Sequence, residues 1–227
     1  SLFVFDLDAP RSAAPVPLLD SDLATITGLE FCPDGSWLGS AHGGMGAVWN
    51  LAAKRAVVLG THQGANLGVD FAPDGRLVTT SAAGAVKTWS IAAGSGEGVS
   101  VLTTLPERQW GHPKVDPRGE FVAVTDPFSA TLYIIPLDGS PPRTHRFEGT
   151  PGIEHWAGAI SIDPAGRRVA ASYVERQNPS ANSIRVLDLE TGDERILNTH
   201  PEGEARCSAG GPVWEGVWSS VWLADGR

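Results

Sequence analysis

A short turn sequence recurs along the chain, always between two apolar stretches, and its spacing strongly limits the possible folds. Its copies are Cys32-Pro33-Asp34-Gly35, Ala72-Pro73-Asp74-Gly75, Asp116-Pro117-Arg118-Gly119, Asp163-Pro164-Ala165-Gly166 and Ala224-Asp225-Gly226. Successive copies are 40, 44, 47 and 60 residues apart. A period near 40 residues is typical of stacked supersecondary units. The chain is therefore predicted to repeat one structural unit around each of these turns.

Each complete unit contains four short apolar stretches, which predict four antiparallel strands. Before the turn, apolar residues recur at every second position, as in Leu67, Val69 and Phe71, although the third unit follows this pattern weakly. No segment of helical length has a 3.6-residue apolar period. An all-β propeller of four-stranded blades is therefore predicted. The predicted strands are 27–31, 37–41, 47–51 and 57–59; 67–71, 77–81, 86–91 and 99–102; 111–115, 121–125, 131–137 and 144–147; and 158–162, 169–173, 184–189 and 195–197.

The two ends of the chain match only parts of this unit. Residues 1–8 and 15–19 resemble a third and a fourth strand, and residues 221–227 resemble a first strand with its turn. Joining them would give a blade without its second strand, and proteins avoid such unpaired edges. We therefore expect part of a larger ring of about seven blades, completed by the same chain or another chain. The predicted blades are 1–20 (partial), 21–60, 61–105, 106–150, 151–200 and 201–227 (partial).

Two predicted third strands carry a family signature. The segments 47–51, with Trp49, and 86–91, with Trp89, resemble the tryptophan-aspartate signature of a WD repeat, and Leu59-Gly60-Thr61-His62 is similar to the Gly-His that opens one. Phe5, Ile135 and Leu187 stand at the Trp position in the other repeats. The chain thus resembles a degenerate bacterial member of the WD-repeat propeller family.

In that family a His, a Ser or Thr, an Asp and the Trp form a buried hydrogen-bond chain inside each blade. The resemblance implies this structural role for His62, Ser81 and Trp89 in the second repeat, where Ala83 replaces the Asp. In the first repeat it implies the same structural role for Trp49, where Ala41 and Gly43 replace the hydroxyl residue and the Asp. Apolar packing between blades is expected to supply most of the cohesion.

Composition narrows the class of partner. The formal net charge of −9 argues against a surface that neutralises phosphates, so nucleic acid is not expected as a partner. The sequence contains no apolar run of 18 residues, and its first residues lack the pattern of a signal peptide. A cytoplasmic location is expected. The six histidines are scattered without a His-x-x-x-His pair, so no metal, cofactor or catalytic residue is predicted.

The loops between second and third strands, and those between blades, are expected on one face of the propeller. The fourth repeat has two long loops there, 175–182 and 200–216. Loops that depart from a repeat commonly carry function. Trp110 and Trp156 either join a contact patch there or fill blade interfaces. The candidate partner-binding residues are Arg108, Trp110, His112, Glu154, His155, Trp156, Arg176, Trp214 and Glu215.

Two functions remain open from the sequence. The favoured one is a non-catalytic scaffold that docks a protein or peptide, as part of a larger bacterial signalling or regulatory protein. The alternative is a lactonase-like propeller with a site at the channel mouth, built on Glu154, His155, Trp156 and Asp163. For that alternative, the amides Asn66 and Asn182, together with Glu154, approximate a metal-binding set.

Overall fold

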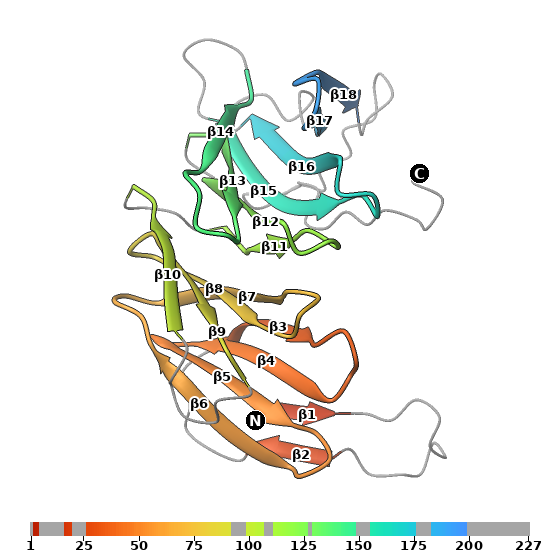
Figure 1. Ribbon diagram of the computed structural model, residues 1–227. Helices are drawn as coiled ribbons and strands as arrows, with labels where there is room; N and C mark the ends of the chain where they lie inside the picture. Colours follow the sequence, from red (N-terminus) through yellow and green to blue (C-terminus); the bar gives the residue numbers. More distant parts are fainter. Residues whose placement is uncertain are drawn as a thin grey trace, which may run out of the picture.

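The computed structural model describes residues 2–4, 16–19, 26–91, 99–106, 111–126, 129–148, 155–175 and 183–198, and these residues form only strands and their connections (Figure 1). They contain no helix of sufficient length and apolarity to cross a membrane. Four antiparallel sheets of four strands each follow one another along the chain. This confirms the predicted all-β fold, in which each sheet is one blade of a β-propeller.

The strands lie close to their predicted positions. Blade 1 contains β3 (Ile26–Phe31), β4 (Trp37–His42), β5 (Met45–Asn50) and β6 (Arg55–Thr61). Blade 2 contains β7 (Asn66–Phe71), β8 (Leu77–Ser81), β9 (Ala85–Trp89) and β10 (Val99–Thr104). Blade 3 contains β11 (Lys114–Val115), β12 (Phe121–Asp126), β13 (Thr131–Pro136) and β14 (Arg143–Arg146). Blade 4 contains β15 (His155–Ile162), β16 (Arg168–Glu175), β17 (Ser183–Asp188) and β18 (Glu194–Asn198). A separate pair, β1 (Leu2–Val4) and β2 (Val16–Leu19), precedes blade 1.

The recurring Gly-containing turn joins the first and second strands of every blade. In each turn the glycine N–H donates to the carbonyl three residues earlier, at 2.8–2.9 Å, as Gly35 does to Cys32. The four glycines, Gly35, Gly75, Gly119 and Gly166, have φ between +63° and +84°. Residues with a Cβ are strained in this left-handed region, so the turn requires glycine there. The sequence repeat is thus a repeat of backbone conformation.

The first strands β3, β7, β11 and β15 are the innermost strands (Figure 1). β3 contacts β7, β7 contacts β11, and β11 contacts β15. β11 has only two residues, which agrees with the weak alternation of the third repeat. Apolar layers fill the space between successive blades. Between blades 1 and 2, Val48 and Leu59 lie against Phe71 and Trp89. Burial of such side chains contributes about 1.5–3 kcal/mol each, which makes these layers the main source of cohesion.

Small residues allow the blades to approach closely. A Cβ added to Gly39 in β4 would come within 2.7 Å of Leu77 Cδ1 and 3.0 Å of Phe71 Cε2 in blade 2. The large side chains of one blade therefore pack against the backbone of the preceding blade.

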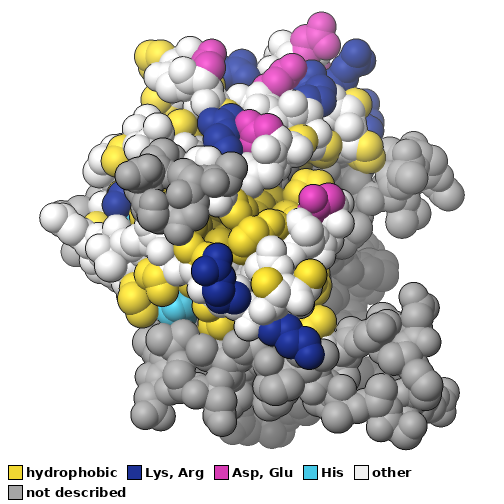
Figure 2. All heavy atoms as spheres, turned by 60° about the horizontal axis from the view of Figure 1, so that its bottom comes forward, with side chains coloured by type: hydrophobic (Ala, Val, Ile, Leu, Met, Phe, Trp, Pro, Cys, Tyr) yellow, Lys and Arg dark blue, Asp and Glu magenta, His cyan; other side chains and the backbone are white. Residues whose placement is uncertain are grey.

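Several large apolar side chains remain exposed. Figure 2 shows hydrophobic side chains gathered in a hollow of one face, with Lys and Arg side chains beside it. Most of the exposed apolar residues belong to the outer strands β6, β10 and β18, whereas two belong to the inner strand β3. They are Val58, Val99, Val101, Ile196, Leu197, Leu29 and Phe31.

Candidate functional site

One set of connections between strands is constant in length, whereas the others vary from blade to blade. The turns between first and second strands, 32–36, 72–76, 116–120 and 163–167, all have five residues, and the connections between third and fourth strands at the same end have four to nine. The loops between second and third strands lie at the opposite end and lengthen from two to seven residues, through 43–44, 82–84, 127–130 and 176–182. We call these the turn end and the loop end. Because loops that vary on a constant scaffold commonly carry binding functions, the loop end is the candidate site.

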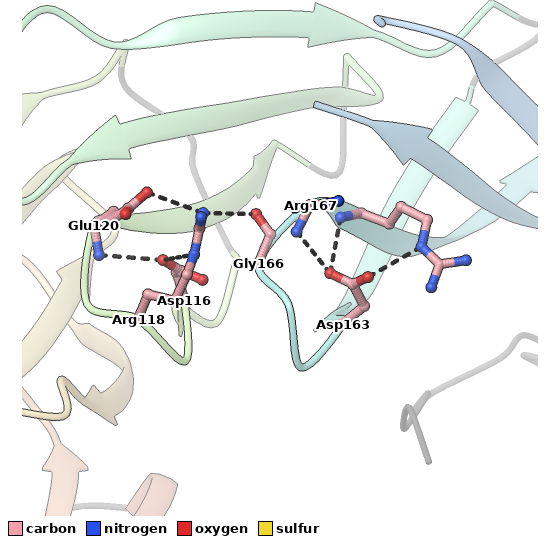
Figure 3. A network of polar contacts seen from close by, with 7 residues as sticks. Asp116, Arg118, Glu120, Asp163, Gly166 and Arg167 are labelled. Carbon is pink, nitrogen blue, oxygen red and sulfur yellow. Dashed lines mark hydrogen bonds and ion pairs between the residues drawn. The ribbon is translucent and has the colours of Figure 1, made fainter. Parts of the chain in front are cut away.

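At the turn end, ion pairs within the turns of blades 3 and 4 accompany a hydrogen bond between the two blades (Figure 3). The Arg118 guanidinium donates from Nη2 to the carbonyl of Gly166 at 3.0 Å and lies 2.9 Å from Glu120 Oε2. Its Nε lies 3.4 Å from the fully buried Asp116. These contacts join the turn of blade 3 to that of blade 4, so this end has a structural role.

Asp163 belongs to the same network. Its Oδ1 accepts the backbone N–H groups of Arg167 and Arg168 at 2.7 and 2.9 Å, and its Oδ2 lies 3.0 Å from Arg168 Nε. Burial alone would raise the pKa of Asp163, but these hydrogen bonds and the Arg168 charge together hold it below its usual value. The expectation that Asp163 lies at the channel mouth beside His155 is wrong. β15 separates the two residues by its whole length, about 25 Å at the usual rise per residue.

At the loop end, the structure places the side chain of one predicted contact residue. His112 precedes β11, and its side chain is exposed and lies over the inner strand of blade 2. A Cβ on Gly68 would come within 2.8 Å of His112 Nδ1. Desolvation there lowers the pKa of His112 from its usual value. His112 thus lies at the loop end against the backbone of blade 2.

The other predicted contact residues are not placed. His155 and Trp156 begin β15, but their side chains lie outside the part that the structure describes. The metal-binding set of the alternative function is not placed either. Asn66 begins β7, but its side chain lies outside the part that the structure describes. Within the described ranges, no group of three or more His, Cys, Asp or Glu residues is arranged to hold a metal ion. Outside those ranges lie Arg108, Trp110, Glu154, Arg176, Asn182, Trp214 and Glu215.

A charged cluster on the inner strands is a feature that the sequence analysis missed. Glu30, Asp70 and Lys114 occupy the same position on β3, β7 and β11, two residues before the turn opens. Lys114 Nζ lies 3.3 Å from Asp70 Oδ2 and 4.0 Å from Glu30 Oε1. The signal was present in the sequence, because aligning the repeats on their turns places the three residues in one column.

Asp70 also joins two blades through the backbone. Its Oδ2 accepts the N–H of Val115 in blade 3 at 2.6 Å, and its Oδ1 accepts the N–H of Phe71 at 2.8 Å. Burial raises the pKa of Asp70 and outweighs Lys114 and these hydrogen bonds. Burial also raises the pKa of Glu30, against the effect of Lys114. All three charged groups are thus used in contacts between inner strands.

The Trp-centred hydrogen bonds expected from the WD-repeat resemblance occur in blades 1 and 2, with a different hydroxyl. In blade 2, Trp89 Nε1 donates to Thr79 Oγ1 at 2.7 Å, and His62 Nε2 is hydrogen-bonded to the same oxygen at 2.6 Å. Ser81, the expected hydroxyl, is buried, and its Oγ has no hydrogen-bond partner among the described residues. The assignment of Ser81 is therefore wrong. Thr79 and Ser81 share one face of β8, so alternation does not distinguish them, but only Thr79 lies at the height of the indole.

Blade 1 differs from its expectation in the same way. Trp49 Nε1 donates to Ser40 Oγ at 2.9 Å, and Ser40 Oγ lies 3.3 Å from His42 Nδ1. The hydroxyl is thus present at Ser40, where the sequence analysis expected its loss at Ala41. The error came from counting from the turn instead of from the strand register, in which Leu38 faces Trp49 as Leu77 faces Trp89.

We expect His62 to make the protein less stable in mild acid. Desolvation, helped by the Lys87 charge, lowers the pKa of His62 to about 4. The unfolded state gains its proton near pH 6.5, so stability falls between about pH 6.5 and pH 4, by at most about 3 kcal/mol. Urea unfolding at pH 7 and pH 4.5 measures this change, and it should be smaller in His62→Gln. Equal pH dependence in both proteins would contradict the assignment, because all other titrating groups cancel in the comparison.

Comparison with known proteins gives the fold but no family. No protein-family model and no curated protein matches the chain. Among solved structures, Kuenenia stuttgartiensis hydrazine synthase is similar, with a TM-score of 0.63, 16% sequence identity and coverage of 84% of this chain. The match covers 53% of the hydrazine synthase chain, so this chain spans about half of that neighbour. At this identity the likeness concerns the fold alone.

Proposed function

We propose that this chain is a degenerate WD-repeat-like segment of a propeller and acts as a non-catalytic scaffold that docks a protein or peptide at its loop end. One observation carries the proposal, namely that the loops between second and third strands lengthen from two to seven residues while every blade keeps its four strands. Loops that vary on a repeated framework commonly carry binding functions. The scaffold belongs to a larger bacterial signalling or regulatory protein in the cytoplasm.

The buried polar groups of blades 1 and 2 support a scaffold over an enzyme. A catalytic base needs an oriented neighbour and access to substrate. His62 is instead buried against Thr79 and Trp89, and Ser40 is buried against Trp49. These side chains stabilise the blades, which leaves partner binding to the loop end.

Selection of binders from a library of random peptides displayed on phage tests the proposal. The recovered peptides are expected to bind the whole chain, and the double variant Trp110→Ala/Trp156→Ala should weaken their binding at least tenfold. The matched control is Asp74→Ala, an exposed change at the turn end, which should leave binding unchanged. Loss of binding in the control and not in the double variant would place the site at the wrong end. Unfolding of the double variant would show that these Trp residues fill blade interfaces.

Metal analysis separates the scaffold from the lactonase-like alternative. The purified protein is expected to contain no stoichiometric divalent metal and to show no thermal shift with added divalent cations. A stoichiometric metal, or a shift of several degrees, would favour the alternative, because a ligand that binds only the folded state raises its melting temperature.

A further inference from the structure

One position of the repeat has two very different environments. Phe31, Phe71, Val115 and Ile162 each precede the residue that opens the turn of their blade. Phe71, Val115 and Ile162 are only 5–7% exposed, whereas Phe31 is 52% exposed. The position two residues earlier behaves in the same way, because Val69 is 6% exposed and Leu29 is 45% exposed. Blade 1 thus presents an apolar strand face that is covered in the blades that follow it.

Blade 2 shows what covers this face. Phe71 pairs with Leu77, which pairs with Trp89, and all three share one apolar cluster with residues of β4, β5 and β6 of blade 1. The strand that carries Phe71, β7, contacts β3 and β4. Gly39 in β4 leaves the space that the Phe71 ring fills, since a Cβ there would lie 3.0 Å from the ring. A pair of antiparallel strands therefore covers this face of blade 2. In that pair a glycine, Gly39, lies opposite the Phe71 ring.

On blade 1, the outer half of the same face already has its cover. Phe31 pairs with Leu38, which pairs with Trp49, and Val4 of β1 packs on Leu38 and Trp49. In the described residues β1 pairs with β2 alone, as a third strand pairs with a fourth. The other edge of β1 has no partner strand among the described residues, and we call it the free edge. Two further strands there would continue this sheet over Leu29 and Phe31. Strand addition to such an edge supplies main-chain hydrogen bonds as well as apolar contact.

We propose that Leu29, Phe31 and the free edge of β1 form a docking surface for an antiparallel strand pair of the same repeat type, with glycine opposite the Phe31 ring. Three features define this partner: its extended backbone pairs with β1, its inward face carries small side chains, and its strands are joined by a five-residue turn. The surface lies on the inner strand next to the turn end. It is therefore distinct from the loop end of the proposed function.

A synthetic peptide tests this directly, because the chain contains such a strand pair. The probe is a fluorescent peptide of residues 26–42, carrying Cys32→Ser, and its anisotropy is followed as the whole chain is titrated in. Saturable binding is expected. A control peptide that also carries Gly39→Leu should bind at least tenfold more weakly, because its side chain occupies the space of the Phe31 ring.

Matched variants of the protein locate the binding. Phe31→Asp should weaken peptide binding at least tenfold, and Val101→Asp, at a similarly exposed residue of β10, should leave it unchanged. Both variants should melt within a few degrees of the parent. The proposal fails if the peptide does not bind, if Phe31→Asp binds it as well as the parent, or if Phe31→Asp unfolds the chain. It also fails if sedimentation shows a dimer that Phe31→Asp dissociates and the peptide does not, because a second copy would then cover this face.

Discussion

Replacement of Thr79 by Val is expected to lower the free energy of unfolding by about 4 kcal/mol. Valine keeps the shape of the side chain and removes the oxygen that both His62 Nε2 and Trp89 Nε1 use. Each ring nitrogen then stays buried without a partner, at a cost of about 2 kcal/mol each. Urea unfolding followed by Trp fluorescence measures the loss directly.

The matched control is Ser81→Ala, two residues along the same strand face. Ser81 Oγ is buried and has no hydrogen-bond partner among the described residues, so its removal should change the free energy of unfolding by less than about 1 kcal/mol. A large loss for Ser81→Ala together with a small one for Thr79→Val would restore the assignment made from the sequence. The pair of variants therefore decides which hydroxyl holds blade 2 together.

Replacement of Asp70 by Ala is expected to destabilise the protein by about 3 kcal/mol. The change removes the carboxylate that accepts the Val115 and Phe71 N–H groups. It also removes the ion pair between Asp70 and Lys114. Breaking a buried pair typically costs about 3–5 kcal/mol. The lower end applies here because the Lys114 side chain is 40% exposed and water can solvate its charge. The loss is measured by urea unfolding.

A local measurement distinguishes this contact from general destabilisation. Hydrogen exchange at the Val115 amide should accelerate in Asp70→Ala, because that amide loses its acceptor. The control Asp74→Ala breaks the exposed pair with Arg76 and should cost less than about 1 kcal/mol without changing exchange at Val115. Unchanged exchange at Val115 in Asp70→Ala would show that this contact does not join blades 2 and 3.

The strands were predictable because their signals are local. Alternating apolar residues and a glycine that must adopt positive φ recur in each repeat, and both act within a few residues of chain. Third and fourth strands were placed to within a few residues even where the Trp is replaced, as in β13 with Ile135. Local pattern thus sufficed for the fold class and for the four blades.

The hydrogen bonds inside and between blades were less predictable. Counting along the chain gave Ser81, because the face of a strand repeats every second residue and two hydroxyls occupy one face. The pairing of β8 with β9 places Leu77 opposite Trp89, and the hydrogen bond from Trp89 Nε1 shows that the indole reaches diagonally to Thr79. A resemblance to a family predicts which kinds of residue form the hydrogen-bond network inside a blade. The strand register then determines which of the candidate residues take part.

By itself, the sequence determined a repeated four-stranded unit with a glycine-dependent turn, because backbone conformation and apolar periodicity are properties of neighbouring residues. Tertiary structure alone decided which groups meet across blades. Asp70 reaches Val115 and Lys114 over more than 40 residues of chain, and the exposure of Phe31 differs from that of Phe71 although both hold the same place in the repeat. The physical reason is that burial and hydrogen bonding between blades depend on what lies opposite a strand, which its own sequence does not specify.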